Sequence, residues 1–444
     1  MKRPAPRFDD PRADPPIDPY LPANGNRGYR VSRYELDIDY RVASNSLSGT
    51  AHITATTTRP VSRIAFDFGQ GLDAGKVRVN GTRPAKFAHR DGKLVITLRD
   101  RIDTGAALAV TISYAGNPTP IDGPWGEVGW EELTDGALVA SQPNGAASWF
   151  PCDDHPSAKA SFRISVTTES SYTAVANGVF VGKRVRASRT TWTYEQPEPM
   201  SPYLATVQIG RYEQRQLSRS PVRIMAATPP HLRTLFDRDF RKQPDMMRVF
   251  TRLFGPYPYD RYTVVVADDT LEIPIEAQGM SIFGSNHCTG RGSYERLIAH
   301  ELAHQWFGNS VTARRWRDIW LHEGFACYAE WLWSENSGGQ PAREKANRAH
   351  AGLARESQSI VIGDPGPELM FDDRLYKRGA CTLDALRRTI GDRSFFVMLR
   401  EWTDVHRYGT VVTEDFIDLA GRYGCPRGFW EPWLYRTQLP AMPS

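Results

Sequence analysis

Residues 297–308 read LIAHELAHQWFG, and within them the run HELAH places His300 and His304 four residues apart. The apolar residues on both sides of the run favour a helix. On a helix, two histidines with this spacing project from one face about one turn apart, so both imidazoles can reach a single metal ion. Glu301 then lies beside the ion, where its carboxylate can accept a proton from a metal-activated water molecule. The run therefore predicts a metal site.

A third ligand is offered by Glu323, which follows His304 after eighteen intervening residues, in the sequence WLHEGFA at residues 320–326. The neighbours of Glu323 are mostly apolar, and a buried carboxylate needs a compensating partner, for which a metal ion is sufficient. Two histidines and one glutamate are a ligand set of catalytic zinc sites, which keep the fourth position for water. We therefore expect His300, His304 and Glu323 to bind zinc.

The surroundings of these ligands carry further expectations. Ser293 is a suitable N-cap for the helix that carries HELAH, and Gly308 can end that helix in the left-handed conformation. Glu330 follows Glu323 by seven residues, so the two share a helix face, and Glu330 can accept a hydrogen bond from a metal-binding histidine. An exposed surface position is an equal alternative for Glu330.

The composition is that of a soluble globular protein. The chain has 444 residues, of which 40% are hydrophobic and 24% charged, and this length suits two or three domains. The net charge of +4 without a long basic block argues against nucleic acid as a partner. No signal peptide and no apolar stretch of about 18 residues is found, so we expect no membrane association. Five cysteines without a CxxC pair indicate a reducing compartment, and we expect a cytoplasmic protein.

The organisation of the chain changes twice along its length. Residues 1–27 are rich in proline, and we expect a flexible tail. Residues 28–215 contain short runs of strand-like composition between turn formers, which predict a β-rich domain. Residues 216–444 are richer in helical pattern, with a long helix-permissive stretch at 232–254 and a buried strand at 262–267. We place the boundary in the polar, linker-like stretch 212–219. The expected strands of the first domain are 34–42, 64–68, 94–98, 107–113, 162–167, 190–194 and 204–209.

Four separated motifs together resemble the aminopeptidase N family of gluzincin zinc metallopeptidases. The motifs are HELAHQWFGN at residues 300–309, Glu323 in its apolar setting, SWFPCDDHP at residues 148–156 and YKRGA at residues 376–380. They occur in the order of the family and span most of residues 30–435. The resemblance implies a multidomain α+β protein, with a β-rich, saddle-like N-terminal domain followed by a thermolysin-like α/β zinc peptidase domain. The chain is similar to a short two-domain form of the family, without the C-terminal helical domain. We therefore expect a more open active site than in family members that carry this domain.

The resemblance also implies roles for individual residues. His300, His304 and Glu323 correspond to the ligands of one zinc ion. Glu301 corresponds to the general base that activates water and passes the proton to the leaving amine. Tyr376 corresponds to the phenol that stabilises the oxyanion of the tetrahedral intermediate.

Recognition of the substrate amino terminus is implied less directly. Many family members carry the sequence GAMEN, whose glutamate holds the free α-amino group, whereas this chain has IPIEA at residues 273–277 and keeps only the glutamate, Glu276. Gln142 and Asn144, in SQPNG at residues 141–145, resemble a second segment that contacts the amine and the first side chain. A simple polar turn is nearly as good an interpretation of these two residues.

The function that the resemblance implies is a zinc-dependent aminopeptidase, which hydrolyses the N-terminal bond of peptides with a free amino terminus. Two alternatives stay open. The same metal site could belong to a hydrolase of another substrate class, such as an epoxide hydrolase or an endopeptidase. The fold could also serve as a non-enzymatic scaffold, although a scaffold has no physical need for Glu301 and Tyr376.

Overall fold

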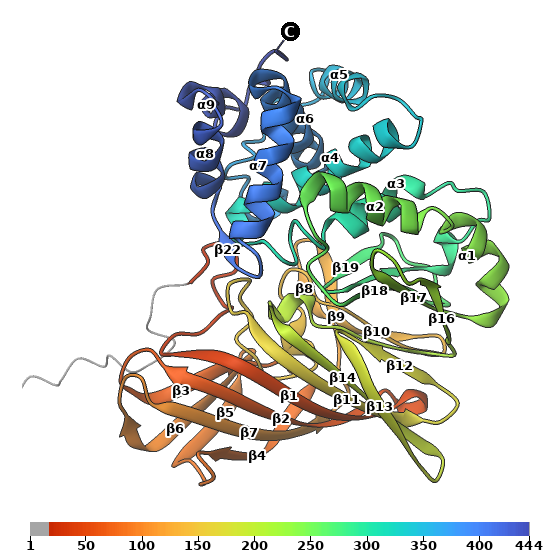
Figure 1. Ribbon diagram of the computed structural model, residues 1–444. Helices are drawn as coiled ribbons and strands as arrows, with labels where there is room; N and C mark the ends of the chain where they lie inside the picture. Colours follow the sequence, from red (N-terminus) through yellow and green to blue (C-terminus); the bar gives the residue numbers. More distant parts are fainter. Residues whose placement is uncertain (1–16, 444) are drawn as a thin grey trace, which may run out of the picture. The chain divides into compact units, whose positions relative to one another are not determined.

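The chain divides into two compact units, Met1–Arg211 and Tyr212–Ser444. The computed structural model describes residues 17–443 (Figure 1). Most of the expected tail lies outside the described residues. Its last part is not a free tail, because residues 17–24 form bends and turns, and Asp18, Leu21 and Asn26 are buried. The expectation of a flexible segment up to residue 27 was therefore wrong for residues 17–27.

The first unit is built mainly from β-strands, as the sequence predicts. Strand β1 shows why: its residues are buried and exposed in alternation, with Tyr34, Leu36, Ile38 and Tyr40 facing the core. Strand β1 (Tyr29–Arg41) pairs antiparallel with β2 (Ser46–Thr57) and parallel with β11 (Ala160–Glu169). These strands belong to a seven-stranded sheet, whose order is β13 (Val179–Arg186), β14 (Arg189–Met200), β11 (Ala160–Glu169), β1 (Tyr29–Arg41), β2 (Ser46–Thr57), β7 (Ala107–Gly116) and β4 (Leu72–Val79).

Two smaller sheets complete the first unit. Aromatic side chains fill the core beside them, and the ring of Tyr34 packs on those of Phe150 and Phe162 at centroid distances of 5.5 and 4.8 Å. One sheet has the order β12 (Thr173–Ala176), β15 (Val207–Gly210), β10 (Gly136–Ala140), β9 (Gly126–Leu133) and β8 (Ile121–Gly123). The other has the order β3 (Val61–Asp67), β6 (Lys93–Ile102) and β5 (Lys86–Arg90).

The second unit contains a five-stranded mixed sheet. Its order is β16 (Glu213–Ser218), β17 (Arg223–Thr228), β18 (Arg261–Val266), β20 (Met280–Phe283) and β19 (Ile275–Ala277). The expected linker at 212–219 was wrong, because residues 213–218 pair antiparallel with β17 as an edge of this sheet. The expected boundary between residues 215 and 216 would cut β16, and a sheet edge of such polar composition is easily mistaken for a linker.

Helices form the rest of the second unit (Figure 1). The helix-permissive stretch 232–254 contains two helices, and Pro244, which lacks the N–H that a helix interior needs, lies in the first turn of the second helix. Helix α4 is buried from Trp320 to Trp333 and packs against both α3 and α6. The helices are α1 (Arg233–Asp239), α2 (Gln243–Phe254), α3 (Glu295–Ala303), α4 (Trp320–Asn336), α5 (Ala342–Leu353), α6 (Asp373–Ile390), α7 (Asp392–Val405), α8 (Thr413–Arg422) and α9 (Trp430–Leu434); two short strands, β21 (Thr312–Ala313) and β22 (Thr410–Val411), pair in parallel.

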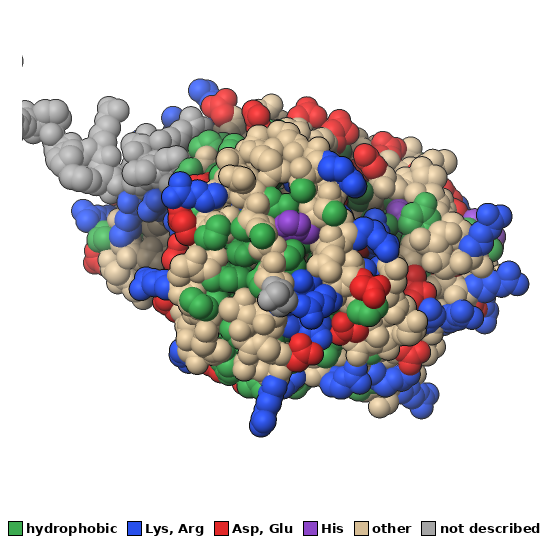
Figure 2. Space-filling model, turned by 90° about the horizontal axis from the view of Figure 1, so that it is seen from above, with side chains coloured by type: hydrophobic (Ala, Val, Ile, Leu, Met, Phe, Trp, Pro, Cys, Tyr) green, Lys and Arg blue, Asp and Glu red, His purple; other side chains and the backbone are tan. Residues whose placement is uncertain are grey.

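The surface carries charges of both signs. On the face shown in Figure 2, basic and acidic side chains are interspersed, and neither sign forms a continuous field. Within residues 17–443, no helix combines the length and the apolar character needed to cross a lipid bilayer.

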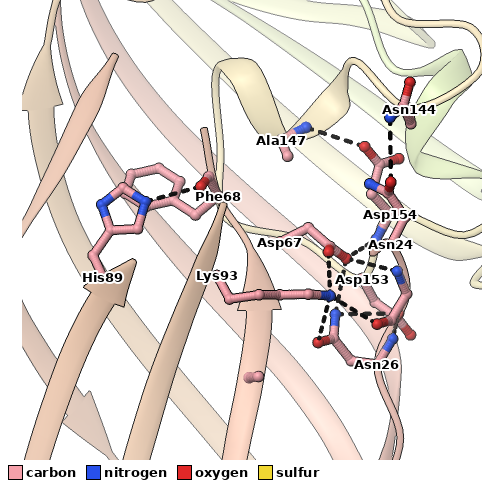
Figure 3. Close-up of polar contacts among 12 residues, drawn as sticks. Asn24, Asn26, Asp67, Phe68, His89, Lys93, Asn144, Ala147, Asp153 and Asp154 are labelled. Atoms are coloured by element: carbon pink, nitrogen blue, oxygen red, sulfur yellow. Dashed lines mark hydrogen bonds and ion pairs between the residues drawn. The ribbon is translucent and has the colours of Figure 1, made fainter. Parts of the chain in front are cut away.

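A buried ion pair organises one end of the first unit (Figure 3). The carboxylate of Asp67, 2% exposed, pairs with the ammonium group of Lys93. The same carboxylate accepts hydrogen bonds from the Gly25 and Asp154 backbone N–H groups, at 3.1 and 2.8 Å, and from Asn26 Nδ2 at 2.9 Å. One side chain therefore holds together three segments that lie far apart in the sequence.

We expect Lys93→Met to lower the free energy of unfolding of the first unit by about 3–5 kcal/mol, because it leaves the buried Asp67 charge without its counter-ion. Urea unfolding measures the change. Lys86→Met is the matched control, since Lys86 is exposed on the neighbouring strand β5 and its replacement should cost less than about 0.5 kcal/mol. Equal losses for the two variants would show that the ion pair does not stabilise this unit.

Candidate metal centre

Helix α3 places the two histidines of HELAH on one face. His300 lies in its last turn, and His304 is the C-cap residue, whose φ of −54° and ψ of −25° keep the helical conformation. The two imidazole centroids are 4.8 Å apart. The arrangement expected from the spacing is therefore present, although the helix ends earlier than Gly308.

The start of α3 differs from the expectation as well. Tyr294 is the N-cap residue, and no side chain caps the helix. The preceding loop is held instead by the buried carboxylate of Asp239, which accepts the backbone N–H groups of Thr289, Gly290 and Gly292 at 2.6, 2.8 and 2.7 Å. Ser293 does not act as the cap, because a residue distant in the sequence fixes the path of the chain into the helix.

His300, His304 and Glu323 converge in the second unit. The Nε2 atoms of His300 and His304 lie 3.5 and 3.4 Å from the same carboxylate oxygen of Glu323, which belongs to α4. The three residues are 7%, 1% and 2% exposed. These contacts bring together the residues that the sequence separates by up to 23 positions.

The other ring nitrogens show what the converging atoms must be. Nδ1 of His304 lies 3.0 Å from the carbonyl oxygen of Phe307, which can only accept, so this nitrogen carries a hydrogen. Nδ1 of His300 lies 2.9 Å from the carboxylate of Glu330 and donates in the same way. In the neutral rings both Nε2 atoms therefore present lone pairs, and they face a third acceptor, Glu323. Three acceptors this close require positive charge between them.

The raised pKa values of the two histidines also indicate that this cluster favours positive charge. Burial lowers the pKa of His300, but Glu323 and Glu330 oppose it and raise that pKa to about 10. Burial also lowers the pKa of His304, and Glu276 and Glu323 together raise it to about 9. The carboxylates thus give this buried cluster a strong preference for cations.

The donor set fits a zinc ion. Imidazole nitrogen and carboxylate oxygen are both common zinc ligands, and bonds of about 2.0–2.1 Å in a tetrahedral arrangement separate two ligand atoms by about 3.3–3.4 Å. The separations of 3.5 and 3.4 Å from Glu323 to the two imidazoles are close to this value. The residues that could hold zinc are therefore the three that the sequence predicts.

Glu330 is buried and serves this cluster. It is 5% exposed, accepts from His300 Nδ1 and pairs with Arg296 at 3.2 Å. The sequence left an exposed position open for Glu330, and the structure excludes it. A carboxylate in this position fixes the ring orientation and raises the basicity of the nitrogen that would bind a metal.

Glu301 lies beside the cluster with an unused oxygen. The residue is 3% exposed, and its Oε2 atom has no hydrogen-bond partner among the described residues. Burial raises the pKa of Glu301, and His300 and His304 lower it; burial has the larger effect, and the pKa is about 7. A buried carboxylate oxygen without a partner is costly, so this atom is available for a proton or a substrate group.

Two further predicted residues reach the cluster from other elements. Glu276, on the edge strand β19, forms with Glu301 and His304 a group whose ligand atoms all lie within 4.8 Å of one another. Tyr376, on α6, lies nearly parallel to the His300 ring at a centroid distance of 6.1 Å. Burial raises the pKa of the Tyr376 phenol well above its usual value, with Glu323 and Glu276 adding to the shift. The phenol therefore keeps its proton.

Gln142 and Asn144 belong to the first unit, between β10 and the turn at residues 146–148. Both are half-buried, and Asn144 Nδ2 donates to Asn24 Oδ1 at 3.2 Å (Figure 3). Their contact with substrate remains a prediction.

Two buried amides were missed by the sequence analysis. Gln305 follows HELAH directly and Asn309 lies four residues further on; both are 0% exposed, and both donate to the main chain next to Glu276. Their place after the last metal-binding histidine was the available signal. Polar residues after a helix are usually turn residues, so only the tertiary structure reveals these bonds.

We expect Glu330→Leu to weaken zinc binding about 10–100-fold, because His300 loses the acceptor that orients its ring. Titration against a chelating indicator measures the affinity. Glu344→Leu, at an exposed position of α5, is the control and should keep the parent affinity. A Glu330→Leu protein that binds zinc as tightly as the control would refute this role.

Two family models match parts of this chain. The model of the peptidase M1 N-terminal domain matches residues 31–204, and that of the peptidase family M1 domain matches residues 239–424. Aminopeptidase M1-D of Oryza sativa is 24% identical over 415 residues, which are 86% of this chain and 47% of that protein. Endoplasmic reticulum aminopeptidase 1 of Homo sapiens is 24% identical over 419 residues, 87% of this chain and 44% of that protein. The chain thus spans about half the length of the curated relatives it matches.

Solved structures match along almost the whole chain. An M1 zinc metallopeptidase from Deinococcus radiodurans has 28% sequence identity and a TM-score of 0.86, and the match covers 97% of this chain and 99% of that one. A mutant of that enzyme bound to a Tyr-Ser-Ala substrate matches with a TM-score of 0.87 and the same coverage. The family models, the relatives and the fold agree, and the chain belongs to peptidase family M1.

Proposed function

We propose that this chain is a zinc-dependent aminopeptidase that removes the first residue of peptides with a free amino terminus. The observation that carries the proposal is a further buried carboxylate, Glu276, beside Glu301 and His304. Hydrolysis of an internal bond or an epoxide needs no such group. A carboxylate in this place can bind the positively charged amino terminus of a peptide through charge-assisted hydrogen bonds.

One zinc ion would be held by His300, His304 and Glu323. Bound there, zinc supplies Lewis acidity, which lowers the pKa of a water molecule and polarises a peptide carbonyl. The family membership and the zinc metallopeptidases of matching structure support this choice of metal.

Glu301 acts as the general base. Its Oε2 atom, which has no hydrogen-bond partner among the described residues, would accept the proton of the attacking water and deliver it to the nitrogen of the leaving amine. Tyr376 donates its phenolic proton toward the carbonyl oxygen as negative charge develops there, which stabilises the transition state.

Glu276 decides which bond is cleaved. By holding the α-ammonium group close to Glu301 and His304, it leaves room for only one residue between the amino terminus and the reacting carbonyl. Gln142 and Asn144 would add contacts to the same end of the peptide. The Deinococcus structure with a tripeptide substrate supports peptides as the substrate class.

A cytoplasmic location completes the proposal. The five cysteines are all unpaired and buried, which suits a reducing compartment.

A panel of aminoacyl fluorogenic amides tests the proposal. We expect the zinc-loaded protein to cleave the free-amine substrates and to leave their N-acetylated versions intact. Glu301→Gln should lower kcat by about 10²–10⁴-fold while zinc stays bound, because it removes proton transfer but no ligand.

The variant Glu276→Ala separates the alternatives in the same assay. An aminopeptidase loses kcat/KM for free-amine substrates in this variant, whereas an endopeptidase or an epoxide hydrolase keeps activity on its own substrate. Stoichiometric zinc without cleavage of any substrate in the panel would favour a scaffold and contradict the proposal.

Tyr376→Phe should reduce kcat about 10²–10³-fold with little change in KM, because the phenol acts on charge that develops in the transition state. Steady-state kinetics on one good substrate measure both constants. Tyr328→Phe, a buried tyrosine of the neighbouring helix α4 with a hydrogen bond to Asp384, is the control and should keep the parent kcat. Equal kcat values for the two variants would remove Tyr376 from the mechanism.

A further inference from the structure

Glu276 belongs to β19, a short edge strand with few main-chain hydrogen bonds. Strand β19 has only three residues, lies at the edge of its sheet and, within residues 17–443, pairs with β20 alone. Ile273, just before the strand, is 68% exposed. So short an edge strand does not by itself hold a carboxylate at a fixed place.

The turn after β19 is held from outside the sheet. The side-chain amide of Gln305 forms hydrogen bonds with this turn. Its Oε1 atom accepts a hydrogen bond from the Gly279 backbone N–H at 2.8 Å. Its Nε2 donates to the carbonyl oxygens of Ala277 and Met280 at 3.1 and 3.2 Å. Gly279 has a φ of +73°, a left-handed conformation that glycine adopts without strain. One amide thus satisfies three main-chain groups of the turn.

A second amide secures the same turn. Asn309 Nδ2 donates to the Ala277 carbonyl oxygen at 2.9 Å, so this oxygen receives hydrogen bonds from both amides. Ala277 is the residue next to Glu276. The main chain directly beside the proposed amine anchor is therefore fixed by Gln305 and Asn309.

Both amides belong to the turn that also orients a metal-binding histidine. Gln305 follows His304, and the Phe307 carbonyl oxygen accepts from His304 Nδ1 at 3.0 Å. The turn is itself closed by main-chain hydrogen bonds, among them Asn309 N–H to the His304 carbonyl oxygen at 3.0 Å. The position of His304 and the position of the strand bearing Glu276 are therefore set by one rigid segment.

We propose that Gln305 and Asn309 are positioning residues that fix the separation between Glu276 and the metal centre, and thereby impose the preference for a free amino terminus. The inference rests on the proposed function and deepens it. Both amides are 0% exposed, and both act through their hydrogen bonds to the β19–β20 turn. A shift of about 1 Å in such a group costs about 100-fold in rate when binding geometry selects the reacting bond.

Binding without turnover tests the proposal. In the Glu301→Gln background, a free-amine tripeptide and its N-acetylated form are titrated by calorimetry, with and without Gln305→Met. This change keeps the side-chain volume and removes the three hydrogen bonds. We expect affinity for the free-amine peptide to fall about 10–100-fold, affinity for the acetylated peptide to stay unchanged, and zinc to remain stoichiometric.

Steady-state kinetics give a second readout, measured in the protein that keeps Glu301. Gln305→Met should raise KM for free-amine substrates more than it lowers kcat, because the amine anchor moves while Glu301 and Tyr376 remain in place. Gln305→Glu keeps the acceptor for Gly279 but sets a buried carboxylate oxygen against the Ala277 and Met280 carbonyl oxygens, so it should lower kcat/KM at least as much as Gln305→Met.

Controls separate positioning from general damage. Gln196→Met removes a buried, hydrogen-bonded glutamine of the first unit and should not change the ratio of the two affinities. If Gln305→Met does not fold, Asn309→Ala removes a single bond to Ala277 and should lower free-amine affinity about 2- to 10-fold. Equal losses for both peptides, or an unchanged ratio, would overturn the proposal. A Glu301→Gln parent that does not distinguish the two peptides would instead refute the proposed function itself.

Discussion

Two imidazole lone pairs and a carboxylate oxygen meet in the buried interior of the second unit, at 3.5 and 3.4 Å, and this contact makes sense only around positive charge. Nδ1 of His300 donates to Glu330, and Nδ1 of His304 donates to the Phe307 carbonyl oxygen. In the neutral rings, both Nε2 atoms therefore carry a lone pair and can only accept a hydrogen bond or bind a cation. The surrounding helices are arranged to hold these donors. Helix α3 carries the histidines, and the buried helix α4 carries both Glu323 and Glu330.

The same contact explains why further carboxylates are tolerated nearby. Glu276 and Glu301 add negative charge to a site that is already buried, which is unfavourable unless cations are bound. In the proposed function, a metal ion and a substrate ammonium group together would supply that charge. The chemistry proposed for the site and the stability of the site therefore depend on the same balance of charge.

Local patterns in the sequence predicted a large part of this structure. The alternation in residues 34–40 predicted β1, and the HELAH spacing with Glu323 predicted the cluster, because both depend on the geometry of a single element. Features that depend on distant partners could not be predicted this way. Asp239 replaces Ser293 in fixing the start of α3, and β17 turns the apparent linker into β16. Gln305 and Asn309 read as turn residues until the fold places the β19–β20 turn against them.

Zinc X-ray absorption spectroscopy on the purified protein tests the central claim most directly. If the facing acceptors hold the metal, zinc is present at one ion per chain, with two imidazole nitrogens and carboxylate or water oxygens at about 2.0–2.2 Å. A sulfur ligand at about 2.3 Å, or a protein that takes up no stoichiometric zinc, would contradict the account.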